Sequence, residues 1–206
     1  MLDLLSLKKL RAILVNPDPE SLELSLDDVH HPGLFSLVVG GTEAGKLTRI
    51  FIADTGIPIG AVQLHQHRYG IRLTTLKGLV VQHEAVRCDP GVGGAVHLNI
   101  FKYKSPLNGG DGLTYSGNDL FTLRMFPVPI CGSLEMYHTD FHTISCGSGA
   151  MWMVEELGFK SDSSAVLGVP FDTDGLYTKV SAGRVDTQRI HVLRVVENLI
   201  KKFESL

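Results

Sequence analysis

This chain of 206 residues lacks most of the features that assign a protein to a membrane, to nucleic acid or to an oxidising compartment. No apolar run approaches the roughly 18 residues that a membrane-spanning helix needs. The net charge is −3, and no cluster of Lys and Arg offers a footprint for nucleic acid. The opening MLDLLSLKKLRAILV mixes charged with apolar residues and has no small-residue cleavage site, so we do not expect a signal peptide.

Cysteine is also scarce, and its three copies fit neither a disulfide framework nor a zinc knuckle. Cys88, Cys131 and Cys146 are an odd number, and none of them belongs to a CxxC pair. We expect them to be reduced and structural, because disulfides belong to oxidising compartments. The sequence therefore predicts a cytoplasmic protein with no membrane and no nucleic-acid partner.

The amino-acid composition and the length of the chain favour one globular domain over residues 1–206. The chain is 44% hydrophobic and 20% charged, which is enough apolar material for a sizeable core. Sandwiches and barrels of β-strands often reach this length as a single unit. We see no internal repeat and no clear linker.

The apolar pattern predicts an all-β fold between two helices. Residues 2–14 and about 185–205 have apolar positions near helical spacing, and the second helix is amphipathic, so it should pack on the sheet or on a partner chain. Between them, short β-rich segments are separated by Gly, Pro, Asn and Asp, which is typical of an antiparallel sandwich or barrel with its core over about 34–156. The longest loop is expected at 104–118. The predicted strands are 34–39, 47–53, 59–66, 71–76, 79–87, 95–103, 119–126, 133–137, 141–146 and 150–155.

One glycine-rich segment partly resembles a phosphate-binding loop in its spacing. GGTEAGKL at 40–47 follows a predicted strand and ends in Gly45-Lys46. However, Leu47 occupies the position where such a loop needs a Ser or Thr to hold Mg²⁺, and a strand follows instead of a helix. We interpret the segment as a turn between strands.

Two histidines one residue apart are the strongest chemical signal. They lie in GAVQLHQHRYGIRLTTLKG, residues 60–78, where a strand is predicted. Residues two apart on a strand share a face, so His65 and His67 should point the same way, with Gln63 on that face too. Two imidazoles about 7 Å apart along a strand can converge on one ion, with a third ligand from an adjacent strand.

The frame around these histidines resembles the first motif of the cupin superfamily. Gly60, His65-x-His67 and Gly78 occupy similar spacings, although Ile71 stands where the family usually has a metal-binding glutamate. The resemblance implies a jelly-roll barrel and a further metal-binding His on a later strand. The corresponding region is 126–156, FPVPICGSLEMYHTDFHTISCGSGAMWMVEE, where His142 is the preferred third ligand and His138 the alternate.

Without the glutamate, the resemblance implies a centre of three histidines, to which His83 of the next strand could add a fourth. The cofactor would be a divalent first-row metal ion, with iron favoured and zinc, nickel or manganese as alternatives. Three neutral imidazoles leave the ion its full charge and open positions for water, substrate or oxygen. Three-histidine iron centres occur among cupins in the thiol dioxygenases, which makes a dioxygenase a hypothesis by resemblance.

Further polar residues could line the same cavity. Tyr69 and Tyr137 are near the histidines in sequence and could donate a proton or a hydrogen bond to a ligand as catalytic residues, although both could instead simply fill the barrel. His97, with Asn99 beside it, could face the cavity from the strand at 95–103.

Three functions remain open at this point. The first is a metal-dependent cupin enzyme, an oxygenase acting on a small molecule. The second is a non-catalytic jelly-roll module for small-ligand binding or assembly. The third is a metal-independent sugar epimerase or isomerase, in which a histidine is the general base and a tyrosine the acid. The resemblance also makes a homodimer plausible, since many cupins pair through sheet edges or appended helices.

Overall fold

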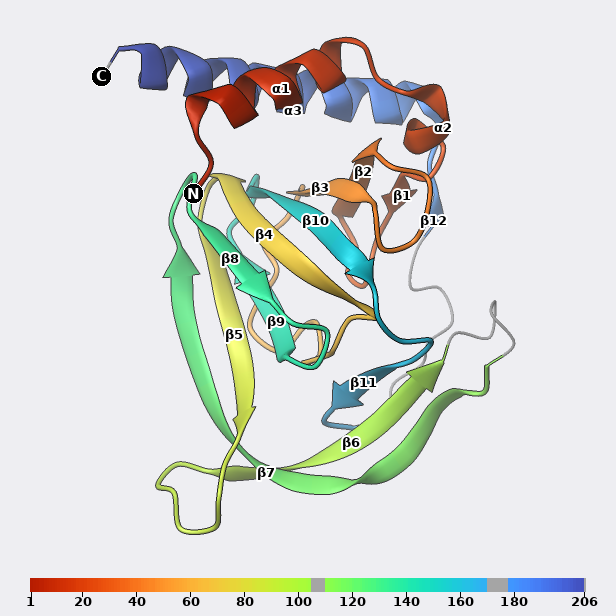
Figure 1. Ribbon diagram of the computed structural model, residues 1–206, viewed down its shortest axis with the longest axis vertical. Helices are drawn as coiled ribbons and strands as arrows, with labels where there is room; N and C mark the ends of the chain where they lie inside the picture. The colour runs from red at the N-terminus through yellow and green to blue at the C-terminus, as the bar shows by residue number, and fades with distance from the viewer. Residues whose placement is uncertain (105–109, 170–177, 206) are drawn as a thin grey trace.

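The protein has three layers, namely two long helices, a seven-stranded antiparallel sheet and a five-stranded antiparallel sheet (Figure 1). This computed structural model describes residues 1–104, 110–169 and 178–205. The seven-stranded sheet has the order β12-β1-β2-β3-β10-β4-β8, and the five-stranded sheet has the order β11-β6-β7-β5-β9. The strands are β1 Leu26–Asp27, β2 Leu34–Gly40, β3 Thr48–Ala53, β4 Tyr69–Lys77, β5 Val80–Arg87, β6 Val96–Lys104, β7 Gly112–Val128, β8 Ser133–Met136, β9 Phe141–Cys146, β10 Met151–Phe159, β11 Ser164–Leu167 and β12 Thr178–Lys179.

Both predicted helices are present, and they lie together on the outer face of the seven-stranded sheet (Figure 1). Helix α1 spans Leu4–Val15, helix α3 spans Ala182–Glu204, and a short α2, Pro19–Leu22, follows α1. Their apolar faces share one buried cluster with β2, β3 and β10, so α3 packs on the sheet of its own chain. No helix in the described residues is long and apolar enough to cross a membrane.

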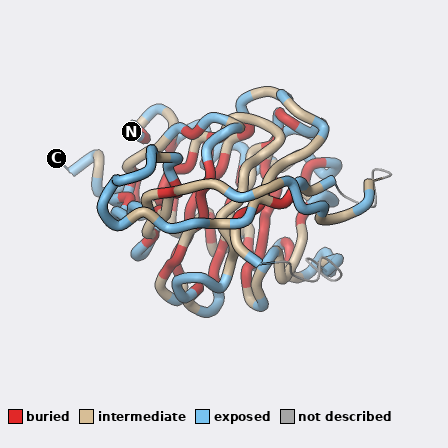
Figure 2. Tube along the Cα trace, turned by 90° about the horizontal axis from the view of Figure 1, so that it is seen from below, coloured by how far each residue is buried: buried red, intermediate tan, exposed pale blue. Residues whose placement is uncertain are grey.

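The inner face of the seven-stranded sheet forms the second core. Trp152 and Val154 of β10 pack there with Ile71 and Leu73 of β4 and with Val80 of the opposite sheet. Figure 2 shows buried stretches of chain running through the middle of the molecule, with exposed turns around them. Cys88, Cys131 and Cys146 are free thiols.

The five-stranded sheet curls until its edges are joined by one residue. Strands β6 and β7 sweep along the bottom of Figure 1, and β7 then rises beside the descending β5. His65 forms antiparallel bridges both to His142 of β9 and to Val166 of β11, which are the two edge strands. The near-closed barrel expected from the sequence is therefore present, and a histidine from the β3–β4 connection bridges its two edge strands.

Two sequence predictions about local structure were wrong. Residues 59–66 are not a strand, because Pro58 and Gly60, the latter at φ +81°, break the extended chain and only His65 is left to form bridges. The predicted loop 104–118 is largely strand, since β7 begins at Gly112 and pairs along the whole of β6. Part of that loop, 105–109, lies outside the described residues.

Candidate metal centre

Three histidines from two distant parts of the chain meet inside the barrel. The backbone amide of His65 donates to the His142 carbonyl at 2.9 Å, and the amide of His142 donates back at 3.0 Å. Residues directly opposite in an antiparallel pair project to the same side. The His65 and His142 ring centres are accordingly 5.3 Å apart, and His67 lies 5.0 Å from His65 and 4.9 Å from His142. Of the two third ligands considered, the structure brings His142 into the group.

The spacing of the three rings fits a single metal ion. Each histidine offers one nitrogen, and all three nitrogens lie within 4.8 Å of one another. Nitrogens that share an ion at about 2.1 Å are roughly 3.4 Å apart in tetrahedral geometry. The Nε2 atoms of His67 and His142 are already 2.7 Å apart, so a small widening would admit the ion.

The outer nitrogens of two of these rings are held by the protein. His65 Nδ1 lies 2.7 Å from the Gln63 carbonyl oxygen, which can only accept, so Nδ1 carries the hydrogen and Nε2 keeps its lone pair. His142 Nδ1 lies 3.3 Å from the Gln82 side-chain oxygen, which can likewise only accept, so this ring also carries its hydrogen on Nδ1. Metal-binding histidines are typically oriented in this way by a carbonyl or amide on the far nitrogen.

Gln82 contacts this cluster, and sequence reasoning missed it. It is fully buried on β5, and its amide nitrogen donates to the Met136 sulfur at 2.9 Å, which turns its oxygen toward His142. The predicted candidate was its neighbour His83. Alternation along β5 puts His83 on the opposite face, where its Nε2 lies 2.8 Å from the Ser145 hydroxyl. That alternation is the sequence signal that could have found Gln82.

Burial keeps the three imidazoles neutral. His142 is 5% exposed. Desolvation lowers the pKa of His67 and His142 well below the usual range, and the neighbouring histidines lower the pKa of each further. The pKa of His65 is also lowered, again chiefly by burial. Neutral imidazoles with free lone pairs are the form that binds metals.

A fourth histidine, His30, lies beside the three. Its ring centre is 5.9 Å from that of His65. The residue keeps solvent exposure, yet protein surrounds the ring closely enough that desolvation, with a smaller contribution from His65, lowers its pKa to about 4. The sequence predicts loop at His30-His31-Pro32, and His30 does lie in a turn without periodicity.

Tyr69 adjoins the cluster, as predicted from its sequence position. Its ring stacks on that of His67 with centres 5.7 Å apart. Burial raises the pKa of the Tyr69 hydroxyl, and the neighbouring Glu156 carboxylate raises it further. Glu156 is itself engaged, since it accepts hydrogen bonds from the amides of Gly45 and Leu47 at 2.6 and 3.3 Å. This acid, opposite Ile71 in the β4–β10 register, lies outside the group of three ligands.

The remaining predicted residues lie away from the cluster. Tyr137 is 79% exposed on the surface, and His97 is exposed on β6. His138 lines a cavity of about 340 Å³ with Gln66 and Thr139. Gln63 contributes its carbonyl oxygen to the site, while its side chain turns away and donates to the Val169 carbonyl at 3.0 Å.

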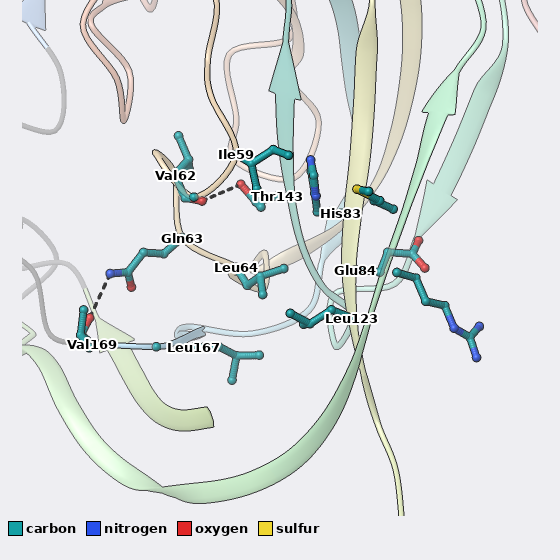
Figure 3. A pocket seen from close by; sticks show the side chains of 14 residues that line it. Ile59, Val62, Gln63, Leu64, His83, Glu84, Leu123, Thr143, Leu167 and Val169 are labelled. Carbon is teal, nitrogen blue, oxygen red and sulfur yellow. Dashed lines mark hydrogen bonds between the residues drawn. The ribbon is translucent and has the colours of Figure 1, made fainter. Parts of the chain in front are cut away.

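A larger cavity of about 560 Å³ lies close to the histidine segment (Figure 3). Gln63 and Thr143, neighbours of the site histidines, line it, whereas His65, His67 and His142 do not. The Thr143 hydroxyl donates to the Val62 carbonyl at 3.0 Å and joins the two walls. Its lining is mainly apolar: Ile59, Gly60, Val62, Gln63, Leu64, His83, Glu84, Leu123, Arg124, Met125, Thr143, Leu167, Gly168 and Val169.

Comparison with known proteins gives distant structural similarity. No family model matches the chain, and no curated protein matches it in sequence. Hydroxypropylphosphonic acid epoxidase from S. wedmorenis is 10% identical, with 68% of this chain and 58% of that chain covered and a TM-score of 0.35. Fe(II)-HppE with its alternative substrate (S)-1-HPP is also 10% identical, with 59% and 49% covered and a TM-score of 0.30. The hydroquinone 1,2-dioxygenase PnpCD, in complex with Cd²⁺ and 4-hydroxybenzonitrile, is 13% identical, with 60% and 63% covered and a TM-score of 0.22.

This chain thus spans about half to three-fifths of the length of the epoxidase and HppE chains. The overlap is partial and the identity low, so the functional inference depends on the residues of this chain. An antiparallel near-closed barrel with His65, His67 and His142 gathered inside it is cupin-like, as the motif at 60–78 predicted.

Proposed function

We propose that this protein is a metal-dependent enzyme, an oxygenase acting on a small molecule, whose His65, His67 and His142 bind one divalent first-row ion. The observation that supports it best is the convergence of three imidazole nitrogens within 4.8 Å. The hydrogen bonds that Nδ1 of His65 and of His142 donate to the oxygens of Gln63 and Gln82 add to it, because they leave Nε2 of both rings free for an ion.

Iron is the favoured ion, with zinc, nickel or manganese as alternatives. When bound, it would supply Lewis-acid or redox chemistry at positions that three neutral ligands leave open. The chain's own residues prepare the site. His67 Nε2 faces His142 Nε2 at 2.7 Å and must release its hydrogen to bind an ion, and Tyr69 covers one face of His67. The apolar cluster around Ile71 and Trp152, against which Tyr69 packs, limits the water that reaches this side.

The stacking of Tyr69 on His67 also favours a second candidate, a metal-independent isomerase. A histidine would be the general base and Tyr69 the acid. Its hydroxyl would carry a proton at any physiological pH, because burial and Glu156 raise the pKa of that hydroxyl. This candidate needs no ion, so metal content separates the two.

The test is elemental analysis of protein purified without chelator. We expect roughly one first-row metal ion per chain in the wild type and little in His65→Ala, because one of three ligands is lost. His97→Ala removes an exposed histidine of β6 and should retain the ion, which makes it the matched control. A wild type that stays metal-free after incubation with Fe²⁺, Zn²⁺, Ni²⁺ and Mn²⁺ would rule out the metal-dependent proposal and leave the isomerase or a binding module.

A further inference from the structure

A sharp turn between β1 and β2 presents His30 toward the three histidines. Asp28 and His30 have φ of +53° and +62°, a conformation that few residues other than glycine adopt. The turn is held by two hydrogen bonds. The Gly33 amide donates to the Asp28 carboxylate at 2.8 Å, and the Val29 amide donates to the Leu34 carbonyl at 2.9 Å. The position of the imidazole is therefore set by a defined turn.

The distance of the His30 ring from His65 is that of two ligands on one ion. The three rings of the metal centre have centres 4.9 to 5.3 Å apart, and His30 lies at 5.9 Å from His65. Rings bound through nitrogens at about 2.1 Å from one ion have centres roughly 4.5 to 6.5 Å apart, depending on the angle between them. His30 is not among the residues whose nitrogens lie within 4.8 Å of one another, so its ring must move toward the group to reach an ion held there.

The imidazole of His30 has nothing else to bind in the part of the chain that the structure describes. Among the hydrogen bonds of the described residues, none involves the His30 ring. The neighbouring His31, in contrast, uses Nδ1 to contact the Pro32 carbonyl oxygen at 2.8 Å. His65 and His142 likewise have one nitrogen occupied by the protein. His30 thus approaches the group with both nitrogens available.

We propose that His30 is a fourth ligand, which joins His65, His67 and His142 when an ion binds. This inference rests on the proposed metal centre. It adds a fourth imidazole to a site in which Ile71 supplies no carboxylate, so all four ligands are neutral and the ion keeps its full charge. On a six-coordinate ion two positions stay open for substrate or oxygen, whereas a tetrahedral zinc would be closed to both.

Cobalt reports directly on this ligand. We would titrate metal-free wild type, His30→Gly and His31→Gly with Co²⁺ and record the visible absorption, with affinities from competition against a chromophoric chelator. Glycine suits the positive φ of position 30, so the variant should fold. We expect His30→Gly to bind Co²⁺ at least about tenfold more weakly, with altered d–d bands that added imidazole restores. His31→Gly should match the wild type.

The outcomes distinguish the two proposals. If wild type and His30→Gly bind Co²⁺ with the same affinity and spectrum, His30 is no ligand and the three-histidine centre stands alone. If the wild type binds no Co²⁺, the metal centre itself fails, and the role of His30 falls with it. Weaker binding by His30→Gly without any spectral change also overturns the inference, because a ligand must alter the cobalt spectrum.

Discussion

Two sides of the short segment 62–67 differ in almost every physical respect. On one side, His65 and His67 turn their rings toward His142, and Gln63 and Gln82 fix the outer nitrogens. On the other side, Leu64 lines a mainly apolar cavity. One side depends on hydrogen bonds that orient nitrogen atoms, and the other on apolar burial. We therefore expect metal binding at the proposed centre and folding stability to respond to different substitutions.

The largest effect should come from the apolar side. Leu167 is 2% exposed and belongs to the cluster of Phe121 and Phe141. Leu167→Ala should lower the free energy of unfolding by about 2–4 kcal/mol because it leaves a cavity, while metal content per folded chain stays unchanged. Urea denaturation and elemental analysis check both parts. Met125→Ala, at a cavity residue that is 67% exposed, is the control and should change stability by less than about 1 kcal/mol. Parallel loss of metal in Leu167→Ala would show that the two sides are coupled.

A smaller effect is expected on the polar side, from Gln82→Leu. Leucine keeps the approximate volume but cannot accept a hydrogen bond from His142 Nδ1. The ring loses its preferred tautomer, so the Kd for the ion should rise about 10- to 100-fold. The measurement is competition with a chelator. Gln188→Leu, which replaces a buried glutamine of α3, should leave the Kd unchanged. Equal affinities for Gln82→Leu and wild type would mean that this amide does not orient the ligand.

The smallest effect concerns acid stability without metal. Burial lowers the pKa of His67 well below its usual value. As the pH falls through about 6.5, the unfolded chain takes up protons that the folded cluster resists, so stability falls with acidification. His67→Asn removes one imidazole whose pKa is lowered in the folded state. Between pH 7.5 and about 5.5, the free energy of unfolding of this variant should therefore fall less than that of the wild type, by on the order of 1 kcal/mol. Urea midpoints at several pH values test this. Parallel pH profiles for both proteins would contradict it.

Much of the fold followed from the sequence because apolar alternation and helical spacing report burial directly. The strands 34–39, 47–53 and 79–87 were predicted nearly at their observed bounds, as were both long helices. The segment 59–66 was not, since its alternation resembles a strand while Pro58 and Gly60 prevent continuous pairing. Short edge strands such as β11 escaped because pairing with a distant partner, rather than local pattern, makes them extended.

The same difference between local pattern and distant contacts applies to the residues of the site. His65 and His67 were found because their spacing is local, and His142 because the family resemblance supplied a distant partner. Gln82 was missed, and His30 was interpreted as loop, because their places beside the cluster depend on tertiary structure, a buried sulfur in one case and a left-handed turn in the other. No local sequence pattern indicates that a glutamine in a strand or a histidine in a turn lies beside a histidine cluster.

The double bridge of His65 has a consequence for the order of assembly. The residue that joins the two edges of the curled sheet is paired with strands far later in the chain, at His142 and Val166. Contacts between such distant positions carry a large loop-closure entropy and form slowly. The last strands must therefore be synthesised and docked before the three imidazoles can meet, so metal loading would come after folding and report that the barrel is complete.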